Sequence, residues 1–250
     1  MPLKSRRLRI MAGPNGSGKS TVLQEVRTKF YSGPFVNADE IEKSFQEKGL
    51  INLPSLYDLT LPDKSFIDFL AGAGKSWVQK AITEKSVISI KSVDGILVVQ
   101  KNPSPYDAAL AADFIRHQLL LKGETFTFET VLSHSSKINF LQQAVGEGYK
   151  NYLYFICTVD PAINIDRVQQ RVLLGGHDVP KEKIIDRYND SLQVLSSIIP
   201  LCHRVYLFDN SSEERSIETV AEIDDKGRLS IKTEQLPWWV EENIIKKLYH

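Results

Sequence analysis

Residues 13–21 read Gly-Pro-Asn-Gly-Ser-Gly-Lys-Ser-Thr, and this stretch decides the fold of the chain. It follows an apolar run, Leu8–Ala12, and precedes an amphipathic run that begins at Val22. The spacing meets the pattern G-x-x-x-x-G-K-[ST] in full, with a strand pattern before it and a helix pattern after it. Such a stretch is typical of a loop that surrounds phosphate groups with backbone N–H groups and adds the positive end of a helix.

Two side chains of this Walker A loop carry its chemistry. Lys19 would neutralise the β- and γ-phosphates of a nucleoside triphosphate, and the hydroxyl of Ser20 would bind Mg²⁺, a hard cation that prefers oxygen ligands. The alternative is a glycine-rich connection that binds nothing, but both the spacing and the strand–loop–helix context favour phosphate. The expected nucleotide-binding residues are Gly13, Pro14, Asn15, Gly16, Ser17, Gly18, Lys19, Ser20 and Thr21.

Size and charge limit the class of protein. The 250 residues suffice for one α/β domain with or without an insertion, and 31 basic and 31 acidic residues cancel, so there is no broad electrostatic case for nucleic acid or a membrane surface. The basic start runs into the glycine loop instead of a signal-peptide core, and no apolar run approaches the roughly 20 residues of a membrane helix. Cys157 and Cys202 lie in apolar segments typical of a core, which favours a reducing, cytoplasmic setting.

Strand-like and helix-like segments alternate along most of the chain, which predicts a mainly parallel sheet covered by helices. We expect an α/β fold, the three-layer sandwich of P-loop NTPases, with an inserted α+β segment and a C-terminal hairpin around Asp225–Gly227. The expected core comprises residues 1–48 and 105–250, and the expected insertion comprises residues 49–104, with a possible role in substrate specificity or partner binding.

Inside the insertion, residues 64–85 predict one helix, and residues 87–90 with 96–99 predict a hairpin. The stretch Gly72–Ser76 looks like a second phosphate loop. Phe69 stands where its first glycine should be, and the context is helical. We therefore expect small residues that allow close helix packing, not a second phosphate site.

Two carboxylates are expected at the edge of the sheet that carries the loop. Asp39 follows the short strand pattern Phe35–Asn37, and Glu129 follows the strand pattern Glu124–Phe128. Ligands of open α/β sheets bind at the carboxyl ends of the strands. By position alone, Asp39 is equally compatible with an acidic residue favoured by a helix dipole, and Glu129 with a helix cap.

Arginines on two consecutive helix patterns indicate a mobile lid over about residues 163–190. Arg167 and Arg171 lie four residues apart and so share a helical face, and Arg187 lies on the next helix, beyond the glycine-rich stretch Gly175–Pro180. Such donors swing over phosphates and release them afterwards. The alternative is a pair of solvated helices, but the phosphate loop favours the lid.

Several short motifs, in this order, resemble the zeta-toxin family of P-loop kinases, and in particular its chromosomal, ATPase-like branch. The resemblance covers residues 5–48 and 105–240 and leaves the insertion outside it. Besides the phosphate loop, the motifs are Asn37–Glu40, Phe128–Thr130 with Leu132–Ser133, Arg171–Val172 with Gly175–Pro180, Arg187–Tyr188 and Asp209–Ser211.

The resemblance implies phosphoryl transfer from ATP or GTP to a hydroxyl of a small molecule, which in toxin members of the family is UDP-N-acetylglucosamine. It assigns Asp39 as general base and Glu129 as the acidic residue beside the acceptor and Mg²⁺. Arg171 and Arg187 match arginines that, together with Lys19, stabilise charge on the transferring group. An antitoxin protein is the partner that the family implies.

One departure from the family leaves the acceptor open. Toxin members carry a basic residue shortly after the base, whereas Glu40, Ile41 and Glu42 stand there in this chain and Lys43 is the nearest cation. Two other classes also stay open. One is an ATP-hydrolysing switch module in which Asp39 positions water or caps a helix, and the other is a 5′-polynucleotide kinase, against which the neutral charge balance argues.

Overall fold

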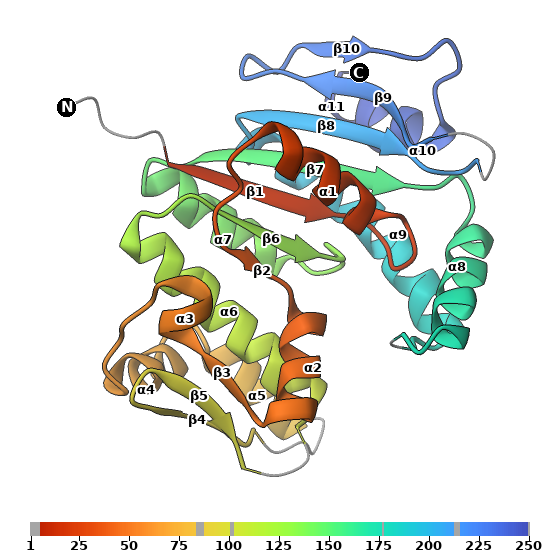
Figure 1. Ribbon diagram of the computed structural model, residues 1–250. Helices are drawn as coiled ribbons and strands as arrows, with labels where there is room; N and C mark the ends of the chain where they lie inside the picture. Colours follow the sequence, from red (N-terminus) through yellow and green to blue (C-terminus); the bar gives the residue numbers. More distant parts are fainter. Residues whose placement is uncertain (1–5, 84–87, 101–102, 177, 213–215, 250) are drawn as a thin grey trace. The chain divides into compact units, whose positions relative to one another are not determined.

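The computed structural model describes residues 6–83, 88–100, 103–176, 178–212 and 216–249 (Figure 1). The chain forms two compact units. The first comprises Met1–Ser32 and Glu129–His250, and the second comprises Gly33–Phe128. The expected insertion over residues 49–104 lies inside the second unit, and its function stays a prediction.

The first unit is built on a mainly parallel sheet. Strand β1 (Arg7–Ala12) pairs in parallel with β7 (Lys150–Cys157), which pairs in parallel with β8 (Arg204–Asp209). Strands β9 (Glu218–Ile223) and β10 (Leu229–Ile231) form an antiparallel hairpin beside β8. The central strands are buried on both faces, which is why they appear in the sequence as apolar runs.

Helices cover both faces of this sheet. Helix α1 (Lys19–Lys29) lies on one face, and α7 (Ser136–Gly146) and α9 (Lys181–Ile198) lie on the other (Figure 1). Helix α8 (Pro161–Leu173) begins with the Asp160 side chain accepting a hydrogen bond from Ala162 N at 2.8 Å and with proline in the first turn. A 3₁₀ turn (Ile199–Leu201) follows α9.

The C-terminal segment is fastened to the sheet by tryptophans. Short helices α10 (Trp238–Val240) and α11 (Lys246–Leu248) flank a π-helical turn, Glu241–Ile245. Trp239 is fully buried and donates its indole N–H to Asp209 Oδ2 at 2.9 Å. Trp238 is half-exposed, yet its N–H donates to the carbonyl of Val159 at 2.8 Å. Both side chains therefore act as packing anchors.

Strand β6 (Phe126–Thr130) pairs in parallel with β2 (Phe35–Val36), and the boundary between the two units falls inside β6. The sheet order along all seven strands is β10-β9-β8-β7-β1-β6-β2. The mainly parallel α/β fold with a C-terminal hairpin is thereby confirmed. Within the described residues, no helix is long and apolar enough to cross a membrane.

The second unit adds a small antiparallel sheet to its helices. Its strand order is β3 (Leu50–Asn52), β5 (Ile96–Val99) and β4 (Ile90–Val93). Helix α2 (Ala38–Lys48) packs against α6 (Pro105–Lys122). Helix α6 begins with a capping box made by Ser104 and Asp107 and ends at Gly123, whose φ of 77° is left-handed.

Several expectations for residues 49–104 were wrong in detail. The single helix expected over residues 64–85 is two helices, α4 (Lys64–Ala71) and α5 (Lys75–Thr83), because the chain turns at Gly72–Gly74; residues 84 and 85 lie outside the described part. The stretch Gly72–Ser76 therefore joins two helices. It lacks the preceding strand that a phosphate loop follows.

The hairpin of the insertion turns at Asp94–Gly95, with φ of 51° and 76°. Its first strand is Ile90–Val93 instead of the expected residues 87–90, of which residue 87 is not described. The segment Asn52–Pro54 ends β3 and begins α3 (Leu53–Tyr57), because Asn52 caps that helix and the Leu53 side chain is fully buried.

Candidate functional site

The phosphate loop runs so close to its neighbours that glycine is required at two positions. At Gly13 (φ +140°) an added Cβ would lie 2.0 Å from the carbonyl oxygen of Ile156 on β7. At Gly16 (φ +75°) it would lie 2.6 Å from the carbonyl oxygen of Asn164 on α8. The loop is therefore shaped by the strand and the helix that it passes.

Helix α1 presents its N-terminal end at the end of the loop. It begins at Lys19, and its N-terminal flanking residue is Gly18, which has no side chain to bond the first N–H groups. The first turn contains neither Asp nor Glu, and Ser20 and Thr21 are exposed. An anion at this place would meet N–H groups and the positive end of the helix dipole.

Lys19 is folded back onto the loop. Its Nζ donates hydrogen bonds to the carbonyls of Gly13 at 3.1 Å and Pro14 at 2.9 Å, and it lies 3.5 Å from Glu129 Oε1. Glu129 lies within the last residues of β6, where the sequence placed it just beyond the strand. It is not a helix cap, because α7 begins at Ser136. The structure thus brings together Lys19 and Glu129, as expected.

Arg187 reaches the loop from α9. Its Nη1 donates to Asn15 Oδ1 at 3.0 Å, and Asn15 is almost fully buried. Arg171 lies on α8, seven residues beyond Asn164 and therefore on the same face about 10 Å farther along the axis. Of the two expected arginines, Arg187 contacts the loop, and Arg171 lies farther along the helix that packs against it.

Sequence reasoning missed two asparagines that hold the loop. Asn164 Nδ2 donates to the carbonyl of Asn15 at 2.6 Å, and Asn210 Nδ2 donates to the carbonyl of Ser17 at 2.8 Å. Asn210 belongs to the Asp209–Ser211 motif, so its position gave a signal. For Asn164 the sequence gave no sign of a contact with the loop, because a polar residue on an amphipathic helix is usually solvent-exposed.

A cavity of about 540 Å³ lies beside the start of α1. A volume of this order suits a small ligand or part of a cofactor. Arg167 stands in its wall and donates to the carbonyl of Asn210 at 2.6 Å, so the arginine expected on the lid also braces this wall. The lining residues are Thr21, Val22, Glu25, Arg167, Gln170, Asn210, Ser212, Ser216 and Ile217.

Helices α8 and α9 share an apolar core of their own. Val168, Val179 and Ile184 are buried together, with Ile165 and Val172 packed against them. At the tip, Leu173 and Leu174 are largely exposed, and Gly175 adopts a left-handed φ of +83°. His177 lies outside the described residues. A helix pair with its own core and a glycine tip has the construction that a lid requires, and its movement stays a prediction.

Asp39 belongs to the second unit, where it lies in the first turn of α2 with an exposed side chain. The cap of α2 is Asn37, whose Oδ1 accepts a hydrogen bond from Asp39 N at 2.8 Å. The carboxylate of Asp39 is therefore not needed as the cap. Its role as general base stays a prediction.

The donor atoms near the loop suit Mg²⁺. Among the described residues, no group of three or more His, Cys, Asp or Glu side chains gathers as a metal site would. Magnesium in phosphate loops needs fewer, since it is held by one or two protein oxygens plus phosphate and water. The exposed Ser20 hydroxyl and the Glu129 carboxylate are oxygen donors of that kind.

Two groups behind the loop are kept neutral by burial. Burial raises the pKa of the Cys157 thiol to about 12, and it also raises the pKa of the Tyr188 hydroxyl. Tyr188 donates that hydroxyl to the carbonyl of Thr158 at 2.6 Å. Both cysteines are free thiols, in agreement with the core role expected for them.

The fold and the loop together define a P-loop α/β protein, since β1 leads through a glycine-rich loop into the N-terminus of α1. Chains of the AvrRxo1-ORF1:AvrRxo1-ORF2 complex have the same fold. The native complex matches with a TM-score of 0.56 and 16% identity, covering 98% of this chain and 66% of that chain. The complex with ATP matches with a TM-score of 0.52 and 16% identity, covering 91% and 61%.

A chain from the PezAT chromosomal toxin-antitoxin system of Streptococcus pneumoniae matches with a TM-score of 0.49 and 14% identity, covering 99% of this chain and 81% of that one. No protein-family model matches the sequence, and no curated protein matches it. This chain spans less than two thirds of the AvrRxo1 complex chains, 61% to 66% of their length. At such identities the likeness to the AvrRxo1 complex chains shows the fold, and it confirms the fold expected from the resemblance to zeta-toxin P-loop kinases.

Proposed function

We propose that this protein is a kinase that transfers the γ-phosphoryl group of ATP or GTP to a hydroxyl of a small molecule. One observation carries the proposal. Groups from α1, β6 and α9 converge on one phosphate loop, because Lys19 lies 3.5 Å from Glu129 and Arg187 donates to Asn15 of the same loop. The fold shared with a complex that was solved with ATP supports the choice of nucleotide.

On the donor side, Lys19 leaves the carbonyls of the loop and moves to the β- and γ-phosphates, which are stronger acceptors because they are charged. The loop N–H groups bind phosphate oxygens, and the cavity beside Thr21 accommodates the base and sugar. Ser20 and Glu129 would hold Mg²⁺, which when bound neutralises charge on the phosphates.

On the acceptor side, Asp39 takes the proton of the attacking hydroxyl. The hydroxyl oxygen forms a bond to the γ-phosphorus in line with the bond to the departing diphosphate oxygen. Arg171 and Arg187 stabilise the negative charge that spreads over the transferring group. Arginines in this role are worth roughly 10³ to 10⁵ in rate in related phosphoryl transfers.

The acceptor class that we propose is a nucleotide derivative, with UDP-amino sugars as the first candidates. The second unit supplies the segment over residues 49–104, where acceptor specificity would be set. Glu40 and Glu42 follow the proposed base, where toxin members of the family carry a basic residue, so the acceptor need not be UDP-N-acetylglucosamine itself. An antitoxin partner is proposed from the same sequence resemblance.

The test is a transfer screen with γ-labelled ATP over sugar nucleotides, nucleotides and cell metabolites. We expect label transfer by the unaltered protein, loss of ATP binding in Lys19→Ala, and at least about a 100-fold loss of transfer with retained ATP binding in Asp39→Asn. Glu47→Gln is the matched control, since it removes one negative charge from the exposed far end of α2 and should retain transfer.

Four results would count against the proposal. Full transfer by Asp39→Asn would exclude Asp39 as the general base. Failure of the unaltered protein to bind ATP with Mg²⁺ would overturn the whole proposed function. Hydrolysis of ATP as the sole activity would identify a switch module instead. Salt-sensitive binding and phosphorylation of oligonucleotide 5′ ends would identify a polynucleotide kinase.

A further inference from the structure

Asn164 is a fully buried polar side chain on the first turns of α8, and both ends of its amide are used. Its Nδ2 donates to the carbonyl of Asn15 in the phosphate loop at 2.6 Å. Its Oδ1 accepts a hydrogen bond from the hydroxyl of Thr158, which is also fully buried at the end of β7. Because Thr158 donates to the oxygen end, the nitrogen end is directed at the loop.

The backbone of α8 also lies against the loop at this residue. A Cβ added at Gly16 would lie 2.6 Å from the carbonyl oxygen of Asn164 and 3.2 Å from its Cα. The loop and the helix are thus in contact through main chain as well as side chain. A shift of α8 would therefore also move the loop, because the two backbones are in close contact.

The next helix reaches the same two residues. Tyr188 on α9 donates its hydroxyl to the carbonyl of Thr158, and Arg187 donates to the side chain of Asn15. Asn15 therefore accepts from α8 through its backbone and from α9 through its side chain. The apolar core shared by α8 and α9 joins the two helices beyond this point.

The hydrogen bond from Asn164 also sets the direction of a loop N–H group. In a trans peptide the C=O and the following N–H point to opposite sides. Asn164 holds the carbonyl of Asn15 toward α8, so the N–H of Gly16 points away from α8. Backbone N–H groups of such loops bind phosphate only when they are aimed at it beforehand.

We propose that Asn164 is a positioning residue that couples the phosphate loop to helices α8 and α9, so that nucleotide in the loop and the position of the helix pair depend on each other. The coupling rests on the proposed function, because it requires a nucleotide in the loop. In this proposal Asn164 does not contact the substrate. It acts through the peptide group between Asn15 and Gly16.

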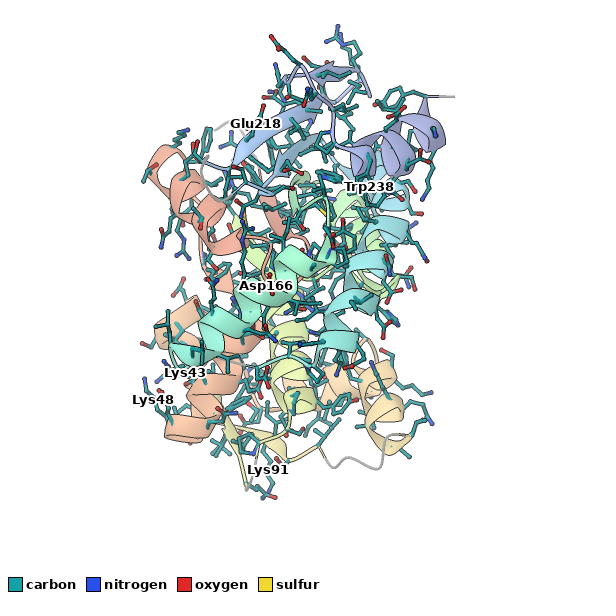
Figure 2. All side chains as sticks on the ribbon, turned by 90° about the vertical axis from the view of Figure 1, so that its right-hand side faces the viewer. Lys43, Lys48, Lys91, Asp166, Glu218 and Trp238 are labelled. Atoms are coloured by element: carbon teal, nitrogen blue, oxygen red, sulfur yellow. The ribbon has the colours of Figure 1, made fainter. Side chains whose placement is uncertain are left out.

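The first measurement is the Kd for ATP with Mg²⁺, by titration calorimetry. Asn164→Ala removes the donor to the Asn15 carbonyl, while the Thr158 hydroxyl keeps its hydrogen bond to the carbonyl of Asp160 at 3.1 Å, and we expect the Kd to rise about 10-fold. Thr158→Val keeps the shape and removes the hydroxyl that orients the amide, so it should raise the Kd by several-fold while the protein still folds. Asp166→Asn, on the outward face of α8 in Figure 2, is the matched control and should leave the Kd unchanged.

The second measurement reads the coupling itself, by amide hydrogen exchange with and without ATP. In the unaltered protein, ATP should slow exchange in the loop and at the start of α9. In Asn164→Ala at saturating ATP, the loop should still be protected and α9 should not be. Undiminished affinity together with protection of α9 in this variant would overturn the coupling alone. Failure of the unaltered protein to bind ATP would overturn the proposed function as well.

Discussion

The fold brings Lys19 and Glu129 together beside the phosphate loop. The ammonium of Lys19 is largely buried and is satisfied by two loop carbonyls and the Glu129 carboxylate. A buried cation without partners would be costly, so these contacts stabilise the lysine, and in the proposed function phosphate replaces them. The sequence motif identified Lys19. Its pairing with Glu129, more than a hundred residues away, required the fold.

Asp224 is a carboxylate whose pKa lies well below its ordinary value of 3.8. The Arg228 side chain and backbone N–H donate to its carboxylate, and together with Lys226 N they lower its pKa to about 2. A lowered pKa in the folded state gives stability above the ordinary value of 3.8, which is lost as the pH falls toward 2.

We therefore expect the β9–β10 hairpin to loosen between about pH 4 and pH 2, with Asp224 titrating near the lower end. The carboxyl resonances in an NMR titration would check this. Asp224→Asn should remove the pH dependence of the hairpin in this window, whereas Asp225→Asn, one residue on and exposed, should not. An unshifted Asp224 resonance near pH 4 would contradict the expectation.

Among the elements, the phosphate loop and the helices with strong end signals followed the sequence most closely. Asp160 with Pro161 stands at the start of α8, and Gly123 stands at the end of α6; such end signals can be read from a sequence because caps act locally. The segment over residues 49–104 was predicted less well. Its strand β3 has three residues and owes its form to pairing with β5, which no local pattern reveals.

Glycines at Gly16 and Gly148 allow a matched comparison at this scale. Their φ angles are +75° and +78°, so alanine at either position carries similar backbone strain. At Gly148 an added Cβ meets nothing within 4 Å in the described part of the chain, whereas at Gly16 it meets the backbone of Asn164 at 2.6 Å.

We expect Gly148→Ala to cost about 1 kcal/mol in the free energy of unfolding and to leave ATP binding intact. Gly16→Ala should cost more and should also abolish ATP binding, because the loop must move away from α8. Denaturant unfolding and calorimetric titration of both variants would check this. Equal losses of stability with ATP binding retained in both would show that the close approach to α8 is unimportant.

At the scale of the whole molecule, the proposed donor groups belong to the first unit and the proposed base, Asp39, belongs to the second. Nucleotide binding should therefore depend on the first unit. Binding of nucleotide to the folded state alone raises the free energy of unfolding in proportion to the logarithm of its concentration.

With ATP and Mg²⁺ at about 100 times the Kd, we expect an added stability of about 2.7 kcal/mol and a rise in Tm of about 5 to 10 °C. Chelation of Mg²⁺ by EDTA should remove most of the rise, because the phosphates would then repel one another and Glu129. Thermal unfolding followed by circular dichroism would measure it. The same rise in EDTA would contradict a role for Ser20 and Glu129 in binding the metal.

The sequence by itself determined the class of the fold, the phosphate loop and the end of a strand from which each carboxylate comes, because periodicity, glycine spacing and caps act over a few residues. Only the tertiary structure decided which residues hold that loop. Asn164 and Arg187 reach Asn15 across about 150 and 170 positions of sequence, and contacts at such separations arise from packing. The loop could therefore be predicted from the sequence, whereas the residues that hold it could be identified only in the folded chain.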